Sequence, residues 1–188
     1  MNERKDSFWK EIIKFTFLVL VVVVPFRLFV AQPFIVSGAS MDPAFADGEY
    51  LIVDQLSKRF EPEQRESVVI FRYPEEPEKF FIKRIIGLPG ETVKINDGVV
   101  TIYNADFPEG KSAGITLVEP YVSEENKKAD DFRAVLSADE YFVMGDNRLG
   151  SFDSRAWGPV PKDLIIGRPI IRLLPISKMN FLPGDFSY

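Results

Sequence analysis

The 188-residue sequence contains no histidine and no cysteine. Without histidine, a serine hydrolase cannot take imidazole as its general base, and a zinc site cannot be built from imidazole ligands. Without cysteine, thiolate nucleophiles, disulfide frameworks and Cys-based zinc sites are excluded. Any chemistry must therefore come from carboxylates, hydroxyls and lysine amines.

Excess basic charge is also lacking. Lys and Arg total 23 against 28 Asp and Glu, a net charge of -5, and no stretch is dense enough in basic residues to bind a polynucleotide. Nucleic acid is therefore not expected as a partner. The hydrophobic content of 46% is sufficient for a buried core, so the sequence predicts one or two modest folded domains.

A strongly apolar run follows the charged first residues and is densest at 15–26. A helix over residues 12–30 would be roughly 28 Å long, close to the ~30 Å hydrocarbon thickness of a bilayer. The basic residues before the run outnumber the single Arg27 just after it. This asymmetry predicts a cytoplasmic N-terminus at 1–11, a single-pass anchor, and residues 31–188 on the outer side of the cell (plasma) membrane.

Two other interpretations of the apolar run remain open. A cleavable secretory leader also has a charged start and an apolar stretch. However, the small residues expected at -1 and -3 are missing, because Ala31 follows Val30 and Phe29. A buried core helix is the second alternative, and the β-branched stretch Val21–Val24 disfavours it, since β-branching costs more helix propensity in water than in lipid. We favour a retained transmembrane anchor.

After Pro33 the pattern changes to short apolar segments separated by turn signals, which predicts strands. The expected strands are 49–54, 67–73, 79–86, 92–95, 99–103, 140–144 and 164–174, with Asn96-Asp97-Gly98 as a hairpin turn. Residues 104–131 are polar and charged, and they are expected to form a surface insertion. The predicted fold class is mainly β: one N-terminal transmembrane helix, followed by an all-β catalytic domain of antiparallel sheets.

Lys83 differs from the other lysines in its surroundings. A lysine acts as a base only when neutral, so burial must lower its pKa from about 10.4 toward neutrality. Strand alternation places Lys83 on one face with Phe81 and Ile85, and that face is apolar. On composition alone, an edge-strand lysine with its ammonium in water is the simpler interpretation, and the neighbouring motifs must decide.

Two further segments carry polar groups with room for a substrate. In Ser37-Gly38-Ala39-Ser40-Met41-Asp42-Pro43, small residues before the second serine let the backbone approach a carbonyl, and the proline fixes the turn. Residues 145–158 form a dense polar run that begins Gly-Asp-Asn-Arg and ends Trp-Gly. Taken alone, each segment is typical of an ordinary hydrogen-bonded loop.

In this order, the segments resemble the type I signal peptidase family of serine proteases. The resemblance rests on residues 37–43, on Lys-Arg-Ile-Ile-Gly-Leu-Pro-Gly-Glu at 83–91, and on 145–158. A weaker strand at 68–71 and the preceding apolar anchor add to it. The match extends to Gly167, so it covers nearly the whole chain.

The resemblance implies a role for each matching residue. Ser40 would be the nucleophile, Lys83 the general base, and Ser151 the hydroxyl that orients the lysine. The oxyanion would rest on the Ser40 backbone N–H and a backbone group near Gly38, where some members of the family have a serine. The implied structural ion pairs are Arg84 with Asp146, and Asp153 with Arg155. The implied substrate pocket is lined by Phe34, Val36, Met41, Phe45, Phe81 and Ile82.

Some positions depart from the family pattern. Ser37 lies one residue out of register with the serine that some members use as an oxyanion donor, so the second donor is open. Ala44 stands where a threonine is usual, and Glu66-Ser67 stands where Gly-Asp commonly precedes the weaker strand. We interpret these last two departures as changes in local structure.

The implied function is that of a membrane-bound serine endopeptidase, signal peptidase I. It would remove N-terminal signal peptides from secreted preproteins after small residues at -3 and -1. Lys83 would take the Ser40 proton during acylation, and no metal or organic cofactor is needed. The expected partners are signal-peptide-bearing preproteins and the lipid bilayer, with a monomer in the membrane and an apolar patch resting in the lipid interface.

Two other functions are weighed against this one. A self-cleaving Ser/Lys peptidase like the SOS-response repressors would carry a DNA-binding module instead of a membrane anchor, and the sequence shows no such module. A catalytically inactive, membrane-tethered β-domain that binds exported proteins is the second. The presence of Ser40, Lys83 and Ser151 argues against it.

Overall fold

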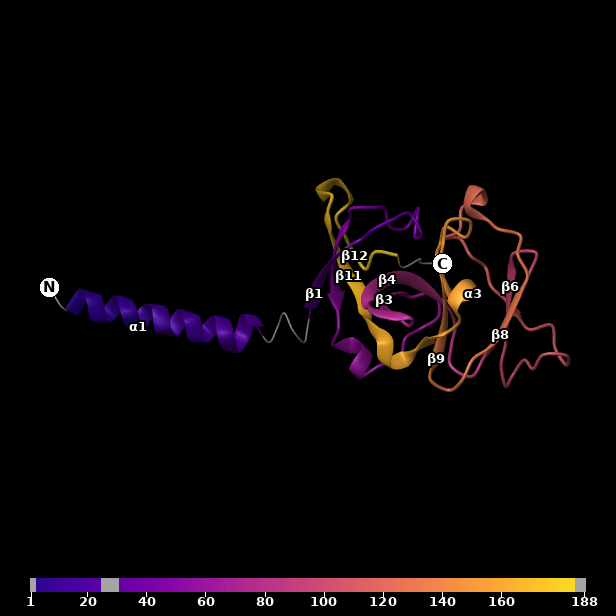
Figure 1. Cartoon of the computed structure of the whole chain (residues 1–188), viewed down its shortest axis with the longest axis horizontal. Coiled ribbons are helices and arrows are strands. Elements are labelled where there is room, and N and C mark those ends of the chain that lie inside the picture. Colours follow the sequence, from indigo (N-terminus) through magenta and orange to yellow (C-terminus); the bar gives the residue numbers. More distant parts are fainter. Residues whose placement is uncertain (1–2, 25–30, 185–188) are drawn as a thin grey trace.

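The computed structural model describes residues 3–24 and 31–184. The chain begins with helix α1 (Glu3–Leu18), which continues as the short π-helical stretch η1 (Val19–Val23). Figure 1 shows α1 extending away from the β-domain. Within the described ranges, we find no helix with the length and apolar character that crossing a membrane requires. Residues 25–30 of the expected span 12–30 lie outside the described residues.

An eight-stranded sheet forms most of the β-domain, in the order β1-β2-β11-β3-β4-β9-β10, with β12 beside β11. Every pairing between its strands is antiparallel. The prediction of a mainly β protein with antiparallel sheets is therefore confirmed. The strands are β1 (Ala31–Ile35), β2 (Tyr50–Asp54), β3 (Val68–Tyr73), β4 (Glu76–Gly87), β9 (Glu140–Met144), β10 (Val160–Pro161), β11 (Ile165–Leu174) and β12 (Asn180–Phe181).

A second, four-stranded sheet has the order β7-β6-β5-β8. Its strands are β5 (Thr92–Asn96), β6 (Val99–Tyr103), β7 (Ile115–Thr116) and β8 (Phe132–Val135). The segment 104–131 supplies β7 and a 3-10 turn, η3 (Glu124–Asn126). Most of this segment is exposed, but Tyr121 within it is only 1% exposed. Part of the segment therefore packs into the domain.

Short helical turns complete the chain between the strands. They are η2 (Ser57–Arg59), the four-residue helix α3 (Ser154–Trp157), η4 (Lys162–Leu164) and η5 (Ile176–Lys178). The carboxylate of Asp153 caps α3 by accepting from the Arg155 backbone N–H. This cap fixes the start of α3, which lies beside β9 and within the polar run 145–158.

Strand β4 connects three hydrophobic clusters. Ile82 packs with Val36 and Leu51, Ile85 belongs to a cluster around Phe71, and Ile86 belongs to the core beneath the second sheet. Burial of apolar surface contributes roughly 25 cal/mol per Å² to folding. Each cluster therefore holds a different part of β4, and the residues between these anchors are held on a well-fixed backbone.

Gly167 marks a close approach of β11 to the end of β2. A Cβ atom added there would lie 1.8 Å from the carbonyl oxygen of Asp54, which is backbone and cannot rotate away. We predict that Gly167→Ala lowers the free energy of unfolding by about 2–4 kcal/mol, because the two strands must separate locally. Urea unfolding followed by tryptophan fluorescence measures the change. An unaltered unfolding midpoint would contradict the close approach.

Candidate active site

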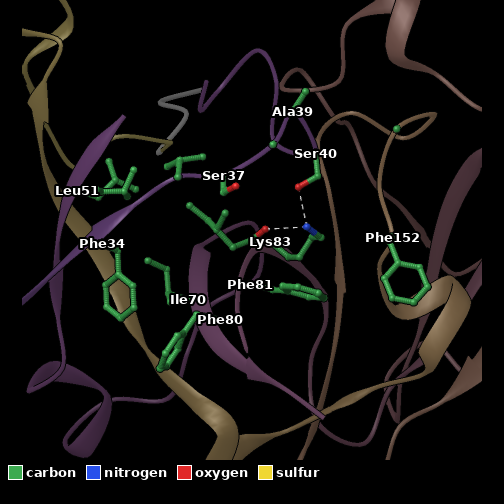
Figure 2. A pocket seen from close by; sticks show the side chains of 15 residues that line it. Phe34, Ser37, Ala39, Ser40, Leu51, Ile70, Phe80, Phe81, Lys83 and Phe152 are labelled. Carbon is green, nitrogen blue, oxygen red and sulfur yellow. Dashed lines mark hydrogen bonds between the residues drawn. The ribbon is translucent and has the colours of Figure 1, made fainter. Parts of the chain in front are cut away.

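A cavity of about 290 Å³ opens between β1 and β4, with the loop 37–40 at one end. Apolar side chains from four different strands, β1, β2, β3 and β4, form much of its wall (Figure 2). Among the described residues that line it, the polar side chains are Ser37, Ser40 and Lys83. The cavity is therefore an apolar groove whose hydroxyl and amine groups gather at one end.

Ser40 and Lys83 are in direct contact at that end. The Lys83 Nζ lies 2.7 Å from the Ser40 Oγ and donates a second hydrogen bond of 3.0 Å to the Ile82 carbonyl oxygen (Figure 2). Lys83 is only 4% exposed, and its amine lies 5.5 Å from the centre of the Phe81 ring. Alternation along β4 thus turns the lysine inward, against the loop that carries Ser40.

Burial is the main influence on the lysine's charge. It lowers the pKa of Lys83 from 10.5 to about 8, while the carboxylates of Asp153 and Asp146 pull the pKa partly back up. A substantial fraction of the amine is therefore neutral slightly above neutral pH. A neutral amine 2.7 Å from a hydroxyl can accept its proton, which is the geometry of a nucleophile and its general base.

Asn147 holds the loop that carries Ser40. Its backbone N–H donates to the Ser40 carbonyl oxygen at 3.1 Å, and its side-chain Nδ2 donates to the Ala39 carbonyl oxygen at 3.1 Å. Its Oδ1 accepts from the Gly150 N–H at 2.9 Å. Asn147 was not predicted as a site residue, although its place in the Gly-Asp-Asn-Arg motif was a usable signal.

Gly145 lets the same loops pack closely. A Cβ atom at this position would lie 2.3 Å from both the Ser151 Oγ and the Ser40 carbonyl oxygen. The Ser151 Oγ is buried and makes no hydrogen bond of ordinary geometry among the described residues, although its hydroxyl contributes to a lowered Asp153 pKa. The structure therefore places Ser151 beside Ser40 but shows no Ser151–Lys83 bond. Its role in orienting the lysine stays a prediction.

Arg84 and Asp146 form a buried bidentate pair behind the site. The Arg84 Nε and Nη2 donate to the two Asp146 carboxylate oxygens at 2.8 and 2.7 Å. The Arg84 Nη1 also donates to the carbonyl oxygens of Glu66 and Gly184, and the guanidinium lies over the Tyr121 ring. One side chain thus connects β4, the motif at 145–148 and the C-terminal part of the described chain.

Asp153 and Arg155 form a second pair, with an Nη2–Oδ2 distance of 2.8 Å. Asp153 also accepts from the Gly145 N–H at 3.0 Å, and Arg155 reaches Asp130 at 2.8 Å. Although burial alone would raise the Asp153 pKa, these bonds lower it, so the carboxylate stays ionised near Lys83. The two ion pairs supply the negative charge that limits how far the lysine's pKa falls.

The expected oxyanion donors differ in their availability. The Ser40 backbone N–H makes no hydrogen bond among the described residues. The Gly38 N–H instead donates to the Asp47 Oδ1 at 2.7 Å, and Gly38 has a φ of +88°. Gly38 is therefore not a free donor in this geometry.

Four of the six expected pocket residues line the cavity: Phe34, Val36, Phe81 and Ile82. Met41 and Phe45 do not, which corrects the sequence-based expectation. They are 1% and 0% exposed and belong to the core beneath the loop, where the Arg172 guanidinium lies 5.0 Å from the Phe45 ring centre. The turn that follows Ser40 directs both side chains into the interior.

Further lining residues were not anticipated, namely Ile35, Leu51, Ile70, Phe80 and Phe152. Leu51 is the ladder partner of Phe34, and Ile70 is the ladder partner of Ile82. Cross-strand register therefore places them in the wall. Strand alternation predicts which face each residue occupies, but only the pairing of distant strands shows that they share a pocket.

Comparison with known proteins places this geometry in a family. The family described as "Signal peptidase, peptidase S26" matches residues 9–174. The chain belongs to this signal peptidase family. Among its relatives, "Probable signal peptidase I-1" of Synechocystis sp. is 35% identical over 97% of this chain and 90% of its own length. "Signal peptidase I T" of Bacillus subtilis is 32% identical over 95% and 92%.

A solved structure is also similar to this member of the signal peptidase family. The crystal structure of a signal peptidase I from Enterococcus faecalis V583 has 31% sequence identity and a TM-score of 0.46, covering 57% of this chain and 97% of that one.

The depressed pKa of Lys83 has a consequence for stability. The unfolded chain binds the proton more tightly than the folded chain, so the protonated amine destabilises the fold fully below pH 8. This penalty is lost as the pH rises through about 8 toward 10.5. We predict that Lys83→Met raises the free energy of unfolding by about 1–3 kcal/mol at pH 7.

Denaturant unfolding at pH 7 and pH 10 measures this effect. The gain should shrink at the higher pH, where the native lysine no longer has to be charged. Lys162→Met is the matched control, because Lys162 is exposed. The idea is wrong if both variants behave alike or if Lys83→Met is the less stable protein at pH 7.

Proposed function

We propose that this protein is a type I signal peptidase, a membrane-bound serine endopeptidase that removes signal peptides from secreted preproteins. The observation that carries the proposal is the contact between the buried Lys83 amine and the Ser40 hydroxyl at the end of an apolar groove. Family membership supports the same reaction. No step requires a metal or an organic cofactor.

The cycle follows from the two groups. As the Ser40 Oγ bonds to the scissile carbonyl carbon, its proton moves to the neutral Lys83 Nζ and the C=O electron pair moves to oxygen. Collapse of this intermediate breaks the C–N bond, and the Lys83 proton goes to the leaving amine. Water then attacks the acyl-enzyme and gives a proton to Lys83. When the ester bond breaks, that proton returns to Ser40 and the signal peptide leaves with a new carboxylate.

Specificity for small residues at -3 and -1 is assigned to the apolar groove. Its walls include Phe34, Val36, Phe81 and Ile82, and the Phe34 ring also packs against Phe80 at a centroid distance of 5.4 Å. A narrow hydrophobic pocket disfavours a larger side chain by steric overlap, whereas it can accept Ala. The inactive, exported-protein-binding alternative has less support, because Ser40 and Lys83 are in direct contact.

The pH dependence of cleavage tests the role of Lys83. Since the neutral amine is the active form and its pKa is about 8, kcat/KM should fall about tenfold per pH unit below that value and level off above it. Cleavage of a preprotein with Ala at -3 and -1, followed by sequencing of the new N-terminus, provides the measurement. A profile that is flat from pH 6 to 9 contradicts a lysine base.

Substitutions complete this test. Lys83→Arg should reduce cleavage by about 10³-fold or more, because arginine stays charged, while Ser40→Ala should bind preprotein without cutting it. Lys162→Arg is the control and should cleave normally. Substantial residual activity in Lys83→Arg would refute the assigned base.

The proposal includes a membrane location, with residues 12–30 as a single-pass anchor and residues 31–188 on the outer side. Nearly all described side chains from Phe8 to Val24 are exposed, and most of them are apolar. Apolar side chains without protein contacts favour a lipid environment. The β-domain offers a second apolar surface close to this segment.

This second surface is the outward face of β1, β2, β11 and β12, which we name the outer sheet face. Two ladder rows cross it: Ile35, Tyr50 and Leu174, and then Pro33, Ile52, Ile171 and Phe181. Ile35 is 67% exposed and Phe181 is 73% exposed. Figure 1 shows β1, β11 and β12 at the end of the β-domain nearest to α1. We assign this face to contact with the lipid interface.

The absence of native cysteine gives a direct test of the lipid contact. Phe181→Cys on the outer sheet face and Phe107→Cys on the side of the second sheet each create one labelling site in the full chain. After reconstitution in vesicles, a polarity-sensitive dye at 181 should emit at shorter wavelength and be quenched by brominated lipid. The dye at 107 should report water. Equal spectra and equal quenching would contradict the assignment.

A further inference from the structure

Attack by Ser40 places a negative charge on the former carbonyl oxygen of the substrate. Fixed hydrogen-bond donors at that oxygen stabilise the transition state more than the ground state. The Ser40 backbone N–H is one such donor, because it makes no hydrogen bond among the described residues. A second donor must come from the cavity wall next to it.

The loop before Ser40 narrows the choice. The Gly38 N–H is committed to the Asp47 carboxylate at 2.7 Å. A charge-assisted bond of this length is stronger than a bond between neutral groups, so this N–H is not easily released. The left-handed conformation of Gly38, with a φ of +88°, changes the course of the chain between Ser37 and Ser40.

Ser37 is an exposed residue on the cavity wall, and its hydroxyl is available to donate. Together with Ser40 and Lys83, it completes the set of polar side chains among the described residues that line the cavity. Its hydroxyl makes no hydrogen bond in the part of the chain that the structure describes. Figure 2 shows the oxygen of Ser37 in the space that the Ser40 and Lys83 groups also face.

The backbone on both sides of Ser37 is fixed. Val36 bonds to Glu49 through its N–H and to Gly48 through its carbonyl oxygen, each at 2.9 Å. On the other side, Asn147 holds the carbonyl oxygens of Ala39 and Ser40. A donor on a loop anchored at both ends needs little rearrangement when the charge develops, which is what makes such a donor effective.

We propose that the Ser37 hydroxyl is a catalytic residue, the second donor to the oxyanion in the acylation and deacylation steps. This inference rests on the proposed peptidase function. Ser37 neither gains nor loses a covalent bond. Its O–H donates a hydrogen bond to the substrate oxygen as the C=O electron pair moves there, and the bond weakens again when the carbonyl re-forms.

The test compares Ser37→Ala, Ser37→Thr and Ser67→Ala in the full-length protein. Ser67 is half-buried, and its hydroxyl makes no hydrogen bond with any residue that the structure describes, so it serves as the matched control. For a preprotein-derived peptide, Ser37→Ala should reduce kcat by about 10²–10³-fold with KM nearly unchanged. Ser37→Thr keeps a hydroxyl and should recover most of the rate, while Ser67→Ala should match the wild type.

A peptide aldehyde ending in Ala separates a donor role from a structural one. It forms a tetrahedral adduct with Ser40 that carries the oxyanion, so Ser37→Ala should weaken its binding by a factor similar to the loss in kcat. Binding of the substrate peptide to Ser37→Ala/Ser40→Ala should equal binding to Ser40→Ala alone. Thermal unfolding checks that each variant is folded. If Ser37→Ala does not fold, Ser37→Cys replaces it, because a thiol is a weak hydrogen-bond donor.

The outcomes distinguish this proposal from the one on which it rests. If the wild-type protein neither cleaves the preprotein-derived peptide nor binds the aldehyde, the proposed peptidase function itself is wrong. Active wild type with a Ser37→Ala kcat within about threefold of it overturns only the role of Ser37. A loss of kcat without a matching loss of aldehyde affinity also overturns the role, because Ser37 would then act elsewhere than on the oxyanion.

Discussion

The site depends on keeping one amine out of water. With no imidazole in the chain, the group that faces Ser40 is a lysine amine, and a lysine accepts a proton only where burial makes its charged form unfavourable. Strand β4 meets this requirement because its neighbouring residues are anchored in three separate clusters, which exclude solvent around Lys83 and fix its backbone. The apolar core therefore sets the chemistry of the amine as well as the stability of the fold.

The charges around the amine work in the opposite direction from burial. Asp146 and Asp153 are each held in a buried ion pair, so their charge acts on the lysine without a direct bond to it. Burial raises the pKa of the Asp146 carboxyl and its pair with Arg84 opposes that rise, whereas the bonds of Asp153 lower its pKa. These carboxylates keep the pKa of Lys83 from falling further. A lower pKa would make the free amine a weaker base. The two arginines thus affect proton transfer only through the carboxylates that they hold.

Much of this arrangement could be predicted from the sequence, and the limits have physical causes. The strands 99–103 and 140–144 were predicted at their observed bounds, because alternating apolar residues and turn signals are local features. The same alternation predicted that Lys83 shares an apolar face with Phe81 and Ile85, but it did not predict that the amine is buried. Strands β1 and β8 were missed, and so were the short strands β7, β10 and β12, since two residues carry no periodicity.

The pocket was harder to predict because it is made by distant segments. Leu51 and Ile70 enter its wall through the register of β2 with β1 and of β3 with β4, which no local pattern specifies. Met41 and Phe45 were misplaced because the turn after Ser40 reverses the direction of their side chains. The commitment of the Gly38 N–H to Asp47 likewise depends on a loop closure nine residues long.

The strand order of the large sheet limits when the molecule can become active. Strand β11 lies between β2 and β3, although it follows them in the chain by more than ninety residues, and Arg84 is bonded to the Gly184 carbonyl oxygen. A chain still emerging from the ribosome has a gap in the middle of its sheet and lacks the Gly184 carbonyl, which is one of several partners of the Arg84 guanidinium. Ser40 and Lys83 lie in the first half of the chain, so they are synthesised well before the strand and the carbonyl that complete their surroundings.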